Sequence, residues 1–294
     1  MSQELATAAV LNYIGFDPLS LLSLAFIVLI GLPHGAFDGA VALALGYGKT
    51  VKTMFGFVVT YILISALVVA FWLAYPVLAL LLFLVISLRH FGLGDSQVVG
   101  LPQRGIQSLA HGGLVVVGIS LLHRDAVDPI FAHLIDGETT LLWSALVLAA
   151  YGLVVILLVY AVLAYFQPVL RRRFAELCGL AIAYALLPPL AGFALYFCAV
   201  HSARHVRLIW HNLRESGHGG RKMLPLALLF TLASWLAGAF ALWMIPAAES
   251  LDRAILRVIF IGLAALTVPH MILVDGMFRR KAHAIDDTAN GELT

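Results

Sequence analysis

Residues 140–166 read TLLWSALVLAAYGLVVILLVYAVLAYF, an uninterrupted stretch without Asp, Glu, Lys or Arg. A helix that crosses the hydrocarbon core of a bilayer needs about 20 mostly apolar residues. The whole chain of 294 residues has the same character, since 62% of its residues are hydrophobic and 12% are charged. An average soluble domain is about 25% charged. The composition therefore excludes a soluble globular enzyme and predicts an all-α, polytopic transmembrane helix bundle.

Other stretches of the chain are also long and apolar enough to cross a membrane. We expect about nine spans, with eight to ten segments compatible with the sequence, in a single integral membrane domain over residues 1–294. The break at Gly31 to Pro33 divides the first span, because proline removes a helix hydrogen bond. The predicted spans are residues 18–45, 53–75, 76–95, 105–123, 140–166, 173–189, 190–214, 225–246 and 251–278.

The charges between these spans predict the orientation of the chain. If the N-terminus lies outside, every cluster of Lys and Arg falls on one side of the membrane, as the positive-inside rule requires. The opposite connection at 124–139 is acidic. We therefore expect an integral protein of the cell (inner) membrane whose C-terminus lies in the cytoplasm. The net charge is only +2, and the sequence contains no stripe of basic residues interleaved with aromatic ones, so no nucleic-acid partner is expected. The clusters are Lys49 and Lys52, Arg104, Arg171 to Arg173, Arg214 with Arg221 and Lys222, and Arg279 to Lys281.

Five of the eleven histidines lie in apolar spans, where a polar side chain is costly and normally faces the bundle interior. They are all on spans that run from outside to inside in the predicted topology. His205 and His270 each precede a cytoplasmic arginine by nine residues, or about 13 Å of helix. Similar depth allows their imidazoles to converge on one centre. The five are His34, His90, His201, His205 and His270.

Local spacing supports a metal site built from these residues. His201 and His205 are four residues apart and share one helix face, a common way for one helix to give two imidazoles to a metal. Asp38, Asp95 and Asp275 follow histidines closely and are either hydrogen-bond partners of the imidazoles or direct ligands.

Two further features bear on this site. The segment Leu32-Pro33-His34 with Asp38 is echoed by Val268-Pro269-His270 with Asp275, which places the same chemistry near both ends of the chain. Cys178 and Cys198 lack a CxxC partner. Imidazole-rich ligation without thiolates suits Fe, Zn, Cu or Ni, and spacing alone does not choose among these metals.

At these residues the sequence resembles the Brp/Blh family, the bacteriorhodopsin-related-protein-like β-carotene 15,15′-dioxygenases. The matching pieces extend from the first span to the last. They are Gly31-Leu32-Pro33-His34-Gly35-Ala36-Phe37-Asp38, Arg89-His90-Phe91-Gly92 with Asp95, His201-Ser202-Ala203-Arg204-His205, and Pro269-His270 with Asp275.

The resemblance implies a non-haem Fe(II) enzyme that uses O₂ to split the central 15,15′ double bond of β-carotene into two retinal molecules. It implies His34, His90, His201 and His205 as catalytic iron ligands. The role of His270 stays open between a further ligand, a partner of a ligand and a substrate contact. A rhodopsin is a conceivable recipient of the retinal.

A C40 hydrocarbon dissolves in membrane lipid, so such an enzyme needs an apolar tunnel with a polar metal at its middle. The aromatic residues near the histidine motifs are weak candidates to line this tunnel, since a lipid-facing position or core packing is the favoured explanation for each. These candidates are Phe37, Phe91, Tyr196, Phe197 and Trp210.

Three other functions fit parts of the pattern. Intramembrane His and Asp residues and broken helices are typical of ion or proton transporters, but the outer halves of the histidine-bearing spans are nearly free of polar groups. A membrane cytochrome would place axial histidines on facing helices and show haem absorption. A non-catalytic assembly factor for a retinal protein would tolerate the loss of His201.

Overall fold

The computed structural model describes residues 15–96, 100–215, 223–246 and 249–291, without the side chains of His34, Leu101 and residues 275–291. Within these residues every element of secondary structure is a helix. Seven helices are long and apolar enough to cross a membrane. The prediction of an all-α bundle with many apolar spans is therefore confirmed.

Several of these spans are built from shorter helices of different kinds, and η marks a π-helix or a 3₁₀-helix. In chain order the helices are α2 (Pro18–Phe26), η1 (Ile27–Gly31), η2 (Leu32–Phe37), α3 (Asp38–Ala44), α4 (Val51–Ala74), α5 (Pro76–Asp95), α6 (Leu101–Gly113), η3 (Leu114–Gly118), α7 (Ile119–Leu122), α8 (Arg124–Ile135), α9 (Thr140–Phe166), α10 (Pro168–Leu186), α11 (Pro189–Ala194), η4 (Leu195–Ser202), α12 (Ala203–Glu215), α13 (Met223–Met244) and α14 (Leu251–Gly291).

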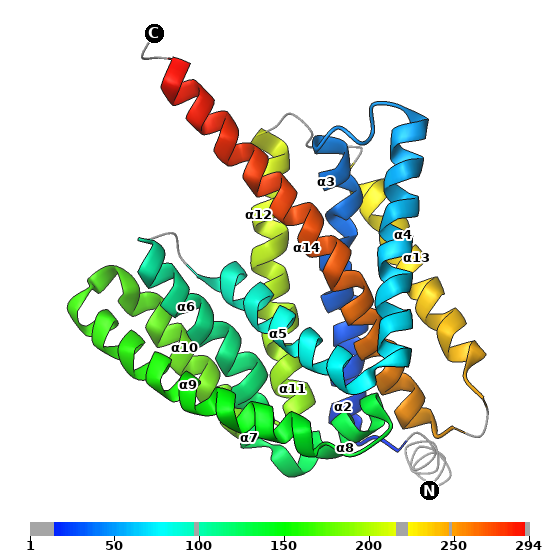
Figure 1. Cartoon of the computed structure of the whole chain (residues 1–294), viewed down its shortest axis with the longest axis vertical. Coiled ribbons are helices and arrows are strands. Elements are labelled where there is room, and N and C mark those ends of the chain that lie inside the picture. Colours follow the sequence, from blue (N-terminus) through cyan, green and yellow to red (C-terminus); the bar gives the residue numbers. More distant parts are fainter. Residues whose placement is uncertain (1–14, 97–99, 216–222, 247–248, 292–294) are drawn as a thin grey trace, which may run out of the picture.

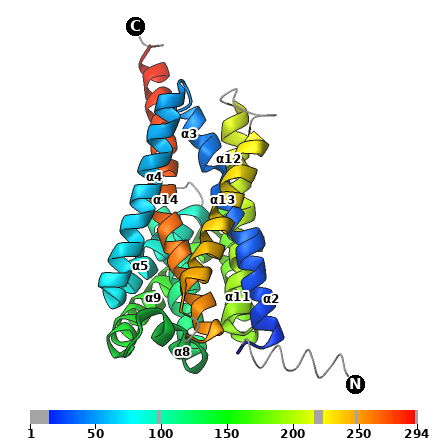
Figure 2. The ribbon, with the colours of Figure 1, turned by 90° about the vertical axis from the view of Figure 1, so that its right-hand side faces the viewer.

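The helices form two groups that meet along α5, α11 and α12 (Figure 1). Helices α6, α9 and α10 pack together on one side, while α2, α3, α4, α13 and α14 form the other. Turned by 90°, the bundle shows α2 and α11 side by side (Figure 2). This arrangement brings the histidine-bearing helices α5, η4, α12 and α14 to the middle of the molecule.

The seven candidate spans match the predicted positions closely, and 76–95 and 140–166 coincide with α5 and α9. The predicted spans 173–189 and 190–214 fall outside the seven. Helix α10 contains Arg171 to Arg173 and Glu176, which are too many charges for an apolar span. Along α11, η4 and α12 the hydropathy is lowered by His201, Arg204 and His205.

The predicted break in the first span is confirmed. After α2 the chain forms a π-helix over Ile27–Gly31 and a 3₁₀-helix over Leu32–Phe37, with Pro33 near its start. A backbone carbonyl that such a break exposes must find another donor inside a membrane. The indole N–H of Trp235 donates to the carbonyl of Val28 at 3.0 Å. The break is therefore stabilised from α13, beside the segment that carries His34.

Two glycines set the close packing of α5 on α6. A Cβ at Gly92 would lie 2.0 Å from the carbonyl oxygen of Ser108, and one at Gly112 would lie 1.9 Å from that of Leu88. Only glycine permits backbones to approach so closely, as is common between membrane helices. Because His90 lies between Leu88 and Gly92, this contact fixes the position of the helix that carries it.

The connection predicted at 124–139 contains a helix that the sequence analysis did not anticipate. Helix α8 buries Val127, Phe131 and Leu134 against the bundle. The indole of Trp72 donates to the carbonyl of Leu134 at 3.0 Å. The acidic residues at 125, 128 and 136 lowered the apolar signal of this segment, although one face of the helix is hydrophobic.

Candidate functional site

Four imidazole rings from three parts of the chain converge in the bundle interior. His90 comes from α5, His201 and His205 come from η4 and α12, and His270 comes from α14. His201, His205 and His270 are buried. Because His201 and His205 are one helical turn apart, their rings stack with centroids 5.8 Å apart. The convergence expected from span direction is present for these four residues.

The four rings lie close together, and one pair of them is close enough to share a metal ion. The ring centroid of His90 lies 4.9 Å from His201, 6.0 Å from His205 and 5.5 Å from His270. His205 and His270 have centroids 4.8 Å apart. The Nε2 atoms of His90 and His201 are 3.2 Å apart. Two nitrogens on one metal ion, with bonds of roughly 2.1 Å, are about 3.0–3.4 Å apart. The His90–His201 pair therefore has the separation of two ligands.

The remaining rings are near this pair but do not close around it. Among the described side chains, no group of three or more His, Cys, Asp or Glu converges on a point as a bound ion requires. The side chain of His34 lies outside the described residues, although its backbone is part of η2. The donor set of neutral imidazoles fits a divalent transition metal.

A buried carboxylate contacts the histidine of α14. The Oδ1 atom of Asp38 lies 2.6 Å from Nδ1 of His270. The hydroxyl of Tyr61 on α4 donates to Oδ2 of Asp38 at 2.8 Å. Thus the aspartate of the first Pro-His segment contacts the histidine of the second. The side chain of Asp275, the other predicted partner of His270, lies outside the described residues.

The third predicted carboxylate, Asp95, belongs to an ionic network beside the rings. It is fully buried. The hydroxyl of Tyr196 donates to its Oδ2 at 2.5 Å, and Nη1 of Arg204 donates to its Oδ1 at 3.1 Å. Arg204 also pairs with Glu176 on α10. Asp95 thereby connects α5, which carries His90, to the two helical segments that carry His201 and His205.

Removing the cation of this network is expected to destabilise the protein. In Arg204→Met, the carboxylate of Asp95 stays buried without its ionic partner. Breaking a buried pair costs about 3–5 kcal/mol, and partial exposure of Arg204 reduces this to about 2–3 kcal/mol. We expect a lower thermal unfolding temperature in detergent, with at least half of the loss recovered in the double variant Asp95→Asn/Arg204→Met. Arg207→Met, on an exposed position of the same helix, is the control. Equal unfolding temperatures for Arg204→Met and Arg207→Met would contradict this account.

An apolar cavity of about 110 Å³ ends on the His90 side of the rings. Its walls come from α5, η3, α7, α8, α11, η4 and α14. Phe91 and Phe197, two of the predicted tunnel residues, line it. Its wall is therefore mostly hydrocarbon and aromatic, and its polar residues are His90, Ser87, Ser120 and Thr267.

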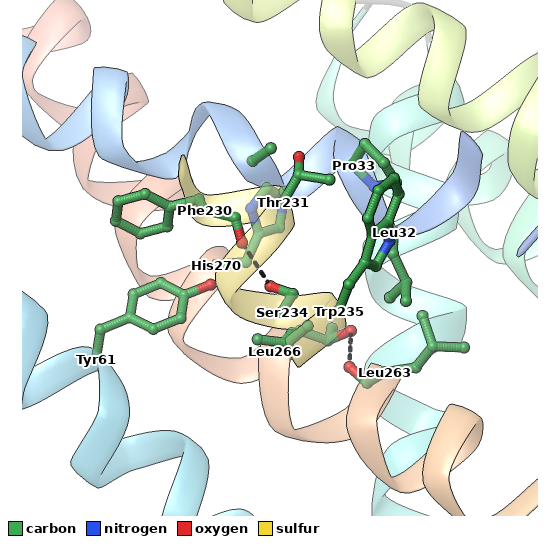
Figure 3. A pocket seen from close by; sticks show the side chains of 13 residues that line it. Leu32, Pro33, Tyr61, Phe230, Thr231, Ser234, Trp235, Leu263, Leu266 and His270 are labelled. Carbon is green, nitrogen blue, oxygen red and sulfur yellow. Dashed lines mark hydrogen bonds between the residues drawn. The ribbon is translucent and has the colours of Figure 1, made fainter. Parts of the chain in front are cut away.

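A smaller apolar cavity of about 40 Å³ lies on the His270 side (Figure 3). It is bounded by η2, α4, α13 and α14. Leu263 and Thr267 of α14 line both cavities. The two cavities therefore border the imidazole group, the larger one at His90 and the smaller one at His270, and α14 lines both of them.

The other predicted tunnel residues lie elsewhere. Phe37 packs edge to face against Trp210 with ring centroids 6.3 Å apart, and neither lines these two cavities. Tyr196 is fully buried and faces Asp95. His111 is buried beside Tyr160 with ring centroids 6.2 Å apart.

Sequence reasoning missed Tyr61 and Arg204. Tyr61 is a lone tyrosine in an apolar span and carries no motif, so nothing in the sequence distinguishes it. Arg204 does carry a signal, because an arginine between two intramembrane histidines requires a carboxylate partner.

Fold and site together define a polytopic membrane protein with an imidazole cluster flanked by apolar cavities. Residues 25–278 match the family model described as Beta-carotene 15,15'-dioxygenase. A Beta-carotene 15,15'-dioxygenase of uncultured marine bacterium 66A03 is 35% identical over 260 residues, covering 87% of this chain and 93% of that protein. The Probable beta-carotene 15,15'-dioxygenase Blh of Halobacterium salinarum is 26% identical over 285 residues, covering 86% and 82%. No solved structure matches. The chain belongs to the β-carotene 15,15′-dioxygenase family, which confirms the resemblance of its motifs.

Proposed function

We propose that this protein is a carotenoid-cleaving dioxygenase that splits the central double bond of β-carotene with O₂ to give two molecules of retinal. The observation that carries the proposal is the imidazole cluster between two apolar cavities, in a chain of this family. A substrate that is all hydrocarbon needs walls without unpaired polar groups. The polar rings are confined to the middle, where the reacting bond would lie.

The two flanking cavities suit a long substrate that is cut at its centre. One half of the polyene would extend along α5 toward α8, and the other would extend past His270 toward α13. The volumes of about 110 and 40 Å³ are far below the roughly 300–1,000 Å³ of typical ligand sites. Binding therefore requires helices to separate. Helices α4 and α13, which bury few of their residues inside the protein, are the helices that we propose to move.

The residues proposed to hold the metal are His34, His90, His201 and His205, with His270 beside them. When bound there, Fe(II) would supply the O₂ chemistry that amino-acid side chains lack. The chain itself positions the imidazoles through helix packing and through Asp38. Phe91 and Phe197 pack against His201, with ring centroids 4.8 and 6.2 Å away, and exclude water from that side.

We further propose an orientation with the N-terminus outside and the C-terminus in the cytoplasm, in the cell inner membrane. The end of α12, the start of α13 and the C-terminal half of α14 gather at one end of the bundle (Figure 1). The segment α11, η4 and α12 runs toward that end from the opposite one, so it and α10 are proposed as two crossings beyond the seven apolar spans. Membrane lipid surrounds the exposed faces of α4, α9 and α13. A rhodopsin could then take up the retinal released into the same membrane.

Expression in a β-carotene-accumulating bacterial host tests the activity. We expect carotene to fall and retinal to appear in cells with the protein and not in cells with the empty vector, by chromatography. Isolated membranes should form retinal under air and not under argon. An iron chelator should stop the reaction, and Fe(II) should restore it where Zn(II) does not. Unchanged carotene in aerobic, iron-supplied cells that contain the protein would disprove the proposal.

A further inference from the structure

A hydrogen-bonded chain of three side chains joins the lipid-facing helix α4 to the imidazole cluster. The phenol of Tyr61 donates to Oδ2 of Asp38 at 2.8 Å, and Oδ1 of Asp38 lies 2.6 Å from Nδ1 of His270. Both Asp38 and His270 are buried. Tyr61 lies at the wall of the smaller cavity, with its hydroxyl directed toward the side where His270 lies (Figure 3). The three residues come from α4, α3 and α14, so the chain depends on tertiary packing.

We infer that Tyr61 is a positioning residue that acts through Asp38 to fix the orientation and tautomer of His270 in the metal centre. The inference rests on the proposed function, because it assumes that the imidazole cluster holds a metal. It extends that function in two respects. It brings α14 into the centre, and it assigns a role to a tyrosine on a helix that contributes no histidine.

The hydrogen bonds determine which nitrogen of His270 is available to a metal. A carboxylate oxygen accepts, so the inference assigns the donor role in this contact to Nδ1 of His270. The neutral ring then has its lone pair on Nε2. The centroid of His270 lies 4.8 Å from His205 and 5.5 Å from His90, so the ring is beside the two imidazoles that a shared ion would also contact. A histidine whose second nitrogen donates to a carboxylate is the usual arrangement of a metal ligand.

Tyr61 restrains the carboxylate that restrains the histidine. Asp38 is the first residue of α3, next to the 3₁₀-helix η2, and its side chain is fully buried. With one oxygen bound by the phenol and the other by the imidazole, its plane cannot rotate without breaking a hydrogen bond to a charged group. Such bonds are about twice as strong as neutral ones.

The ring of Tyr61 is held independently of its hydroxyl. It packs edge to face against Phe57 and Phe230, with centroids 5.8 and 6.2 Å away. Tyr61→Phe therefore removes one hydrogen bond and keeps the aromatic packing. Tyr47 provides the matched control, because it stacks on the same Phe57 at 5.5 Å and is 42% exposed. Tyr47→Phe deletes the same atom from the same aromatic group, away from Asp38.

The test is a titration of metal-free, detergent-purified protein with Co(II), followed by its visible absorption spectrum. Residues that orient a ligand typically change metal affinity about 10–100-fold when replaced. We expect Asp38→Asn to weaken Co(II) binding within that range, and Tyr61→Phe to weaken it about fivefold, since it acts one residue further out. Both variants should shift the Co(II) spectrum, and Tyr47→Phe should match wild type. Tyr61→Phe added to Asp38→Asn should have little further effect.

The outcomes separate this inference from the proposed function. If wild type binds Co(II) and Tyr61→Phe has the affinity and spectrum of Tyr47→Phe, the inference is wrong and the metal centre stands. The inference is also wrong if the effect of Tyr61→Phe adds in full to that of Asp38→Asn, because Tyr61 would then act by another route. If folded wild-type protein binds neither Co(II) nor Fe(II), the proposed metal centre fails, and the inference fails with it.

Discussion

Replacing His201 and His205 together by alanine is expected to lower retinal formation at least 100-fold and to remove bound iron from the purified protein. The two rings project from one helical face and stack with centroids 5.8 Å apart. The substitution removes two of the four rings, and with them one member of each of the two closest ring pairs, His90–His201 and His205–His270. Retinal by chromatography and iron by elemental analysis measure the two effects.

The same helix provides the control for this experiment. His211 lies on α12, and its side chain is 70% exposed. We expect His211→Ala to retain wild-type iron and activity, which separates loss of the centre from damage to the helix. If the double variant kept its iron while losing activity, the two residues would contact substrate and the ligands would lie elsewhere. If it kept both, the proposed centre would be wrong.

The parts of the fold that followed from the sequence are those set by local pattern. Membrane helices must satisfy their own backbone hydrogen bonds, so apolar length alone located seven spans. The direction of those spans and the four-residue spacing of His201 and His205 were enough to predict that imidazoles converge. Helix α8 was missed because the acidic residues on its exposed face lower the hydropathy of the segment, although its other face is apolar.

The pairing of the carboxylates could not be derived from sequence. The three aspartates were expected to be hydrogen-bond partners of histidines, on their own span or on a neighbouring one, or direct ligands of the metal. In the structure Asp38 contacts His270, while Asp95 contacts Tyr196 and Arg204. These partners are determined by how helices pack across the bundle, and a buried charge selects the donor that is nearest in space. Aromatic residues were ambiguous for the same reason, since Phe91 and Phe197 line the cavity and Phe37 and Trp210 pack on each other.

Filling the apolar cavity beside His90 with a larger side chain is expected to lower retinal formation strongly. Val116 lines this cavity from η3 and is buried. In Val116→Phe the larger side chain would occupy much of the cavity of about 110 Å³, with little strain because the space is open. We expect retinal formation to fall at least tenfold while iron content stays at the wild-type level, since the imidazoles are unchanged. This combination would show that the cavity holds substrate.

The matched control places the same substitution on a lipid-facing surface. Val154 on α9 is 56% exposed, so Val154→Phe adds the same atoms without entering the cavity. It should leave retinal formation, iron content and thermal stability unchanged. Full activity in a folded Val116→Phe protein would mean that the polyene reaches the imidazoles by another path. Of the two cavities, the smaller one beside His270 and α13 would then be the candidate binding site. Loss of iron together with activity would instead mean that η3 supports the position of α5, because the α5–α6 contact at Gly112 directly precedes that segment.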